Sequence, residues 1–233
     1  MFGIFRKNIP VGSTEPLGIA FKDYLATGKN KKIYLSGLQG PKETSIKVSH
    51  FVNLDQGKSM IASKVISLAK GKCLDIGACS GHVSRVLQDN QIQVTALDIS
   101  KSCTEYMLAC GIKEVVCADI WSYEGGKYDT ILLIDGTIGC IGTIDKLPMF
   151  FKKIEQLLTV NGQVLISDNN FDAKNGLREW EGQFRYNNFI GERFNWFNIS
   201  LQNLCHEIES IGWDCDPILK KDNGLYLVRI THK

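Results

Sequence analysis

Apolar and polar positions follow a regular alternation from residue 56 to residue 168. Short, continuous apolar runs predict strands that are buried on both faces, at "KCLDI", "IQVTALD", "EVVCAD", "YDTILLID" and "GQVLISD". Between them, apolar residues recur at helical spacing, around residues 61–69, 83–87, 100–110 and 150–158. This alternation predicts a doubly wound α/β fold, with helices on both faces of a mostly parallel sheet.

The C-terminal end departs from that alternation. A helical stripe of Leu201, Leu204 and Ile208 follows Ser200, which can cap its N-terminus. Two apolar runs, "GWDCDPILK" and "GLYLVRIT", then succeed each other with only a short turn between them. Such a pair predicts a hairpin, so we expect a seven-stranded sheet whose last strand is antiparallel.

Residues 1–55 have a different character. Pro16 to Thr27 predicts a short helix that ends at Gly28, and 32–35 and 46–48 predict short strands around a turn-rich segment. We interpret residues 1–55 as an N-terminal cap or lid, and residues 56–233 as the main domain.

The first apolar run leads into a glycine loop, "CLDIGACSGHVSRVL". Ligands of doubly wound sheets bind at the carboxyl ends of the strands, where strand order reverses. Gly77 and Gly81 allow a tight turn and a close approach of the backbone to a ligand. The helix that follows presents free N–H groups to polar ligand groups.

Acidic residues end the first three strands of the pattern. Asp75 ends the first, Asp98 the second and Asp119 the third. A carboxylate after the second strand can accept hydrogen bonds from two ribose hydroxyls. Asp119 can accept one from an adenine amino group. Together with the glycine loop, the three acids predict a nucleoside-containing ligand.

At these residues the chain resembles class I S-adenosylmethionine-dependent methyltransferases, over residues 56 to 233. The resemblance rests on the D-x-G-x-x-x-G loop, the acids after strands two and three, and the terminal hairpin. It implies S-adenosyl-L-methionine as cofactor and a methyl transfer to oxygen or nitrogen of a small molecule. The cofactor residues it implies are Asp75, Gly77, Ala78, Cys79, Gly81, Asp98, Ile99, Asp119, Ile120 and Asp135.

Two positions depart from the family pattern. Cys79 stands where many members have glycine, so we expect its backbone to avoid the conformations reserved for glycine. Asn53 stands where the resemblance places an arginine that would contact the cofactor carboxylate.

Candidates for the chemistry lie at the ends of strands four and five. A hydroxyl or ammonium acceptor must lose a proton, and Asp135, Asp168 and His50 are the candidate bases. We interpret His82 as a residue that orients the loop and His206 as a surface residue. Asp135, Asp168 and Asn169 also resemble the Mg²⁺ ligands of catechol-type O-methyltransferases, although no lysine follows Asp135 as it does there.

Two other readings of the binding residues stay open. A nicotinamide dehydrogenase would use G-x-G-x-x-G, whereas the glycines here are spaced G-x-x-x-G. A catalytically silent S-adenosylmethionine-binding protein would carry the same cofactor residues.

Composition and charge limit the classes of partner that are expected. The net charge is +2, and the place of a (D/N)-P-P-(Y/F/W) element reads "IDGTIGCIG", so nucleic acid is not expected as substrate. The aromatic residues between 184 and 197 are expected to line an apolar small-molecule pocket or to pack as core. No apolar run reaches the roughly 18 residues of a membrane span, so no membrane partner is expected. Eight cysteines without a C-x-x-C pair indicate reduced thiols in a cytoplasmic protein.

Overall fold

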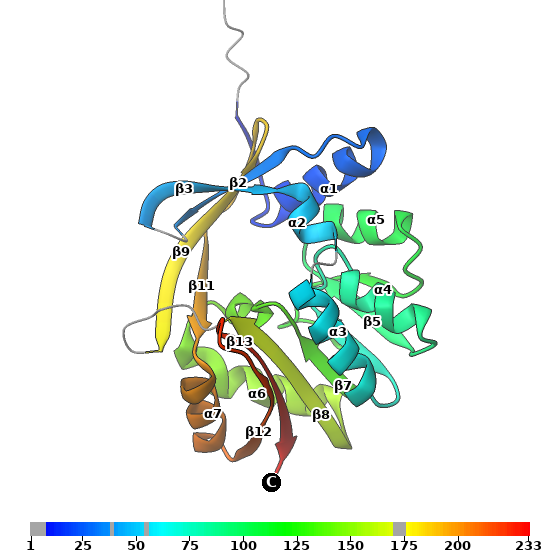
Figure 1. Cartoon of the computed structure of the whole chain (residues 1–233), viewed down its shortest axis with the longest axis vertical. Coiled ribbons are helices and arrows are strands. Elements are labelled where there is room, and N and C mark those ends of the chain that lie inside the picture. The colour runs from blue at the N-terminus through cyan, green and yellow to red at the C-terminus, as the bar shows by residue number, and fades with distance from the viewer. Residues whose placement is uncertain (1–7, 38–39, 54–55, 170–175) are drawn as a thin grey trace, which may run out of the picture.

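The computed structural model describes residues 8–37, 40–53, 56–169 and 176–233, which form two β-sheets with flanking helices (Figure 1). The larger one, the core sheet, has seven strands in the order β12-β13-β8-β7-β4-β5-β6. Its strands are β4 (Cys73–Ile76), β5 (Val94–Asp98), β6 (Val115–Cys117), β7 (Tyr128–Leu133), β8 (Leu158–Asn169), β12 (Trp213–Lys220) and β13 (Leu225–His232). β4 to β8 are parallel, and β13 is antiparallel to both of its neighbours. The predicted fold class is confirmed.

The strand order reverses between β4 and β7. The chain runs outward from β4 through β5 to β6, then returns to β7 on the other side of β4 and continues to β8. Crossovers that lead away in opposite directions leave a crevice above the carboxyl ends of the two central strands. The loop after β4 and the loop after β7 therefore face the same space.

Helices cover both faces of the core sheet, as the continuous apolar strands require. On β7, Ile131 and Leu133 pack with Phe150, whereas Leu132 packs with Val65 on the opposite face. The period of two along a strand produces this division. The helices are α3 (Gln56–Leu68), α4 (His82–Asp89), α5 (Lys101–Ala109), α6 (Leu147–Leu157) and α7 (Leu201–Ser210), with 3₁₀ turns at Thr137–Ile141 and Ile144–Lys146.

The second sheet, here called the cap sheet, combines strands from two distant parts of the chain. Its strands are β1 (Ile9–Val11), β2 (Lys32–Gly37), β3 (Gly40–Lys47), β9 (Leu177–Tyr186), β10 (Phe189–Gly191) and β11 (Phe194–Ile199). β9 pairs with both β2 and β11. In Figure 1 the cap strands β2, β3 and β9 occupy the upper part of the view and the core sheet the lower part.

The N-terminal prediction was incomplete in two respects. The hairpin strands β2 and β3 extend through most of the segment predicted as turns, and Val48 begins the helix α2 (Val48–Val52) instead of ending a strand. Half of the cap sheet comes from residues after 176, so a boundary at residue 55 does not separate the two sheets. The cap sheet forms by pairing between strands that are far apart in the sequence, and a local pattern of residues does not show that pairing.

The first helix, α1 (Glu15–Thr27), attaches the cap to the core sheet's helix α5. Gly18 lies so close to α5 that a Cβ there would overlap the backbone nitrogen of Cys103. The Glu15 carboxylate accepts a hydrogen bond from Ser100 Oγ at 2.8 Å, at the N-terminus of α5. Lys22 and Glu105 form an ion pair across the same contact. Apolar packing and polar contacts therefore both fix α1 to the core.

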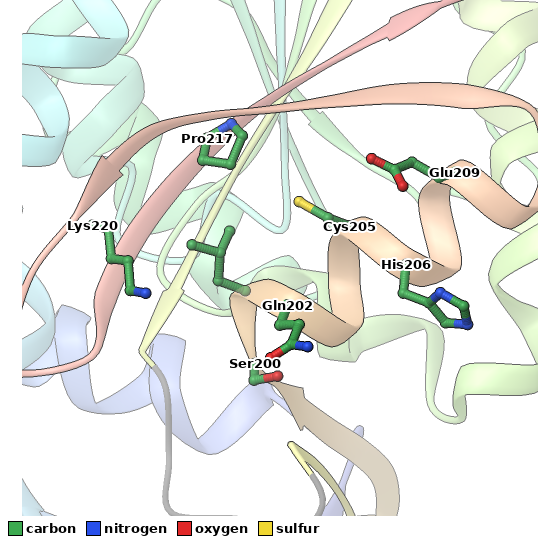
Figure 2. Close-up of a pocket in the computed structure, with 8 residues that line it drawn as sticks. Ser200, Gln202, Cys205, His206, Glu209, Pro217 and Lys220 are labelled. Carbon is green, nitrogen blue, oxygen red and sulfur yellow. The ribbon is translucent and has the colours of Figure 1, made fainter.

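A disulfide corrects the expectation that all thiols are free. Cys205 of α7 is bonded to Cys215 of β12, with 5.2 Å between their Cα atoms. Beside it, a surface hollow of about 590 Å³ lies between α7 and β12 (Figure 2). Figure 2 shows Cys205 directed toward β12, and the exposed His206 confirms the predicted surface position. None of the predicted site residues lines this hollow.

No helix in the described part of the chain has the length and hydrophobicity needed to cross a membrane.

Candidate functional site

A cavity of about 830 Å³ lies at the carboxyl ends of the core strands and is lined by residues of both the core and the cap. The core contributes the loops after β4, β5, β6, β7 and β8, and the cap contributes α1, α2, β2, β9 and β11. Its lining includes these predicted residues: His50, Asp75, Gly77, Ala78, Cys79, Asp98, Ile99, Asp119, Ile120, Asp135, Asp168 and Asn169. The structure thus gathers nearly all sequence-predicted candidates in one cavity. Gly81 does not line it.

The glycines of the loop after β4 make room for protein neighbours. Both have left-handed backbones, with φ of 64° at Gly77 and 71° at Gly81. A Cβ at Gly77 would lie 2.6 Å from the Thr137 side chain, and one at Gly81 would overlap Ile112. The tight turn is as predicted, but the space that a side chain would fill belongs to Thr137 and Ile112 and not to a ligand.

Cys79 also adopts the left-handed conformation, with φ of 55°. The expectation that it would avoid this region is wrong. A non-glycine residue there costs about 1–2 kcal/mol, and tertiary contacts must hold it in place. One such contact is visible, because Cys79 N–H donates a hydrogen bond to Asp98 Oδ2 at 2.8 Å.

Asp98 connects the ends of β4 and β5. Its second oxygen, Oδ1, accepts a hydrogen bond from Ser100 N–H at 2.8 Å. Burial raises the pKa of Asp98, and the two backbone N–H groups of Ser100 and Cys79 oppose that rise. Each carboxylate oxygen has two lone pairs, so both can accept a further hydrogen bond from a ligand hydroxyl.

Asp75 is more deeply enclosed than its position at a strand end suggested. Its side chain is buried and Oδ2 accepts a hydrogen bond from Ser84 Oγ of α4 at 2.6 Å. Burial raises its pKa to about 6, and the hydrogen bond from Ser84 counteracts the rise. Asp75 therefore ties the loop to the helix that follows it, beside the cavity.

The ends of β5 and β6 offer a partly apolar surface. Ile99 is 56% exposed, unusual for an isoleucine, and lies at the cavity. Ile120 is buried and lines the same cavity. Asp119 is exposed, and its Oδ1 accepts a hydrogen bond from Trp121 N–H at 3.0 Å. Two apolar side chains with an acid beside them suit a planar base that carries an amino group.

Asp135 after β7 has a partner that the sequence did not reveal. His82 Nε2, at the start of α4, lies 3.2 Å from Asp135 Oδ2. Its other ring nitrogen, Nδ1, lies 3.4 Å from Ser80 Oγ, which donates a hydrogen bond to the Phe51 carbonyl of α2. This chain of contacts joins cap, glycine loop and β7. Ser80 and Phe51 carried no sequence signal, and His82 was noted only as an orienting residue.

Asp168, the last-but-one residue of β8, is a buried acid with an unused oxygen. Its side chain is 3% exposed, and Oδ1 accepts a hydrogen bond from Asn169 N–H at 2.7 Å. Oδ2 has no hydrogen-bond partner among the described residues. Burial raises the pKa of Asp168 to about 7. The Asn169 N–H, the nearby Ile199 N–H and the Asn198 side chain lower this pKa, and the charge of Asp135 adds to the rise.

The metal hypothesis for Asp135, Asp168 and Asn169 stays a prediction, although all three residues line the same cavity. Asp168 is buried whereas Asn169 is exposed. Within the described residues, no group of three His, Cys, Asp or Glu side chains is arranged to hold a metal ion.

Aromatic side chains of β9 and β11 form the opposite wall of the cavity, here called the aromatic wall. It consists of Trp180, Phe184, Phe194 and Trp196. The rings of Phe184 and Phe194 are stacked with centroids 5.3 Å apart, and Trp196 meets Phe194 edge-on at 6.0 Å. Three of the four were expected at a pocket or in the core. Trp180 was missed, although its spacing from Phe184 has the period of a strand face.

The cavity fits the cofactor that the resemblance implied. Asp98 has lone pairs for ribose hydroxyls, Ile99 and Ile120 offer an apolar surface with Asp119 beside it, and the loop at 77–79 presents backbone. Negative charge on one side of the cavity also suits a positively charged sulfonium.

Comparison with known proteins agrees with this fit. The sequence model of a methyltransferase domain family matches residues 54–217. None of the curated proteins compared matches the chain. The structure is similar to an S-adenosylmethionine-dependent methyltransferase from Bacteroides fragilis in complex with S-adenosyl-L-homocysteine, at 25% identity and a TM-score of 0.84. The match covers 97% of this chain and 98% of that one.

More distant structures share the fold. The glycopeptide N-methyltransferase MtfA matches at 14% identity and a TM-score of 0.60, over 75% of this chain and 87% of its own. A methyltransferase from Clostridium acetobutylicum matches at 16% identity and 0.55, over 77% and 93%. With the family match over most of the chain, the conclusion is that this protein belongs to the methyltransferase domain family and is an S-adenosylmethionine-dependent methyltransferase.

Proposed function

We propose that the protein transfers a methyl group to an oxygen or nitrogen atom of a small molecule with an apolar body. The observation that carries the proposal is the composition of the cavity, which has carboxylates on the core side and the aromatic wall on the cap side. Its volume of about 830 Å³ lies in the range of small-molecule sites, roughly 300–1,000 Å³.

The cofactor residues divide by chemistry. Asp98 would hold the ribose, Ile99 and Ile120 the faces of the adenine, and Asp119 its amino group. The backbone at residues 77–79 would lie along the methionine part. When bound, S-adenosyl-L-methionine supplies an electrophilic methyl group on a positively charged sulfur.

The remaining residues would align the acceptor and manage its proton. The lone pair of the acceptor atom forms the new bond to carbon, the carbon–sulfur pair stays on sulfur, and the acceptor's proton leaves. Asp168 and Asp135 lie at the strand ends where that proton would be released, and His50 lies at the cap side of the same cavity. Alignment and exclusion of water by the cap supply much of the acceleration in such a displacement.

A transfer assay on a fractionated extract tests the proposal. The protein is incubated with methyl-labelled S-adenosyl-L-methionine and either the low-molecular-mass filtrate or the macromolecular fraction of a cell extract. We expect label in products of the filtrate, identified by mass spectrometry. Label only in protein or nucleic acid would contradict the small-molecule assignment, and tight cofactor binding without any transfer would indicate the silent alternative.

A further inference from the structure

The charged side chains that line the cavity are mostly acidic. Of the described residues that line it, five are aspartates and none is a lysine or arginine. The aspartates are Asp75, Asp98, Asp119, Asp135 and Asp168. The basic side chains among them are His50 and His82, and His82 is already paired with Asp135 at 3.2 Å. An anionic acceptor would therefore meet repulsion and find no fixed cation.

One of these carboxylates keeps a buried oxygen without a hydrogen bond. Asp75 accepts a hydrogen bond from Ser84 Oγ, and Asp98 accepts hydrogen bonds from two backbone N–H groups. Asp168 is 3% exposed, and its Oδ2 makes no hydrogen bond with the described residues, although the Ile199 N–H and the Asn198 side chain lie near this carboxylate. A buried carboxylate oxygen without a partner is costly, and a donor with positive charge is the group that satisfies it best.

The aromatic wall is built to present its rings. β-pairing sets Phe194 opposite Gly182 and Trp196 opposite Trp180. A Cβ at Gly182 would lie 2.6 Å from the Trp180 ring and 2.8 Å from that of Phe194, so glycine leaves room for both rings. Aromatic faces attract cations, and they also pack against apolar groups.

We infer that the acceptor is a positively charged amine with an apolar or aromatic body, that Asp168 binds its ammonium group, and that the aromatic wall holds the body. This inference rests on the proposed function and names its substrate class. It excludes phosphate- and carboxylate-bearing acceptors. The transfer requires the ammonium to lose one proton, which the Asp168 carboxylate accepts before the nitrogen lone pair forms the new carbon–nitrogen bond.

Three probes with one ring and different charge test the inference. 2-Phenylethylamine is cationic, 2-phenylethanol is neutral and phenylacetate is anionic. Their binding to the protein saturated with S-adenosyl-L-homocysteine is measured by titration calorimetry or ligand-detected NMR. We expect the amine to bind about tenfold or more tightly than the alcohol, and phenylacetate not to bind, since a close charge pair and a ring face both favour the cation.

Matched variants locate the effect. Asp168→Asn keeps the shape and an acceptor oxygen but removes the charge, so it should reduce the preference of the amine over the alcohol to about twofold or less. Phe194→Leu should weaken the amine and the alcohol together. Asp89→Asn, on the exposed end of α4, is the control and should change neither.

The outcomes separate the inference from the proposed function. Binding of phenylacetate, equal binding of amine and alcohol, or no binding of any probe to the saturated protein would overturn the inference. So would an unchanged amine preference in Asp168→Asn. If that variant does not fold, the comparison of the three probes on the unaltered protein still tests the inference. Failure of S-adenosyl-L-homocysteine itself to bind would instead contradict the cofactor site on which the proposed function depends.

Discussion

The two walls of the cavity are built in different ways. The core wall consists of backbone and carboxylates at the ends of parallel strands, with Asp98 accepting hydrogen bonds from Cys79 and Ser100. The cap wall consists of aromatic side chains on antiparallel strands, with Phe194 in contact with Phe184 and Trp196. Hydrogen bonds specify the first wall, and side-chain packing specifies the second.

This difference indicates which wall tolerates substitutions and which does not. A change in the core wall disturbs the turn itself, because Asp98 is part of the hydrogen bonding that holds a left-handed Cys79. A change of ring on the cap wall alters the shape and polarity that an acceptor meets, whereas the backbone pairing of β9 with β11 remains in place. The four predictions below test this contrast, from the largest expected effect to the smallest.

Replacing Asp98 should damage the core wall most. Asp98→Ala removes a charged acceptor from the ribose and leaves the N–H groups of Cys79 and Ser100 without their partner. We expect S-adenosyl-L-homocysteine affinity to fall by about 3 kcal/mol, roughly 150-fold, measured by titration calorimetry. Asp89→Ala, which removes an exposed ion pair with Arg85, should leave the affinity unchanged. Unchanged affinity in Asp98→Ala would remove Asp98 from the cofactor site.

Asp168 should make the stability of the ligand-free protein depend on pH. Its pKa is about 7 in the fold, against about 3.9 in an unfolded chain. The folded state therefore binds more protons between these values, and the stability falls as pH rises from about 4 to about 7. Asp75, whose pKa is raised to about 6, acts in the same direction.

Asp168→Asn does not titrate, so it should be more stable than the unaltered protein by about 2 kcal/mol at pH 8. The gain should shrink toward zero near pH 4. Thermal unfolding at both pH values measures it. A variant that is equally stabilised at both pH values would show that the effect is not one of charge.

The attachment of the cap to the core can be weakened at Gly18. Gly18→Ala would push a methyl group into the backbone at Cys103. Overpacking of this kind outweighs the roughly 1 kcal/mol that alanine gains in a helix, so we expect a net loss of about 1–2 kcal/mol in unfolding free energy. Gly126→Ala is the matched control, because no atom lies within 4 Å of its added Cβ. Equal stability of both variants would mean that α1 and α5 can move apart enough to accommodate the methyl group at little cost in free energy.

Cys79→Gly should produce the smallest effect. Glycine removes the left-handed strain at φ of 55° but adds freedom to the unfolded chain, so the net gain should be about 0.5–1 kcal/mol. Denaturant unfolding measures it, and cofactor affinity should be retained because the Cys79 N–H remains. A loss of stability would show that the thiol contributes packing that exceeds the strain.

The sequence by itself determined the core sheet and the positions of most acids of the core wall. Continuous apolar runs and helical stripes are local signals, and an acid at the carboxyl end of each strand needs only the parallel arrangement to face one edge. For this reason Asp75, Asp98, Asp119, Asp135 and Asp168 could be predicted to lie together, and they line one cavity.

Tertiary structure alone decided the rest. The cap sheet joins β2 to β9, the pairing of His82 with Asp135 joins α4 to the end of β7, and the disulfide joins Cys205 to Cys215. The left-handed backbone of Cys79 likewise depends on a hydrogen bond to Asp98, nineteen residues away. Each of these features is held by a contact between separate elements, whose free energy does not appear in any local pattern of apolar and polar residues.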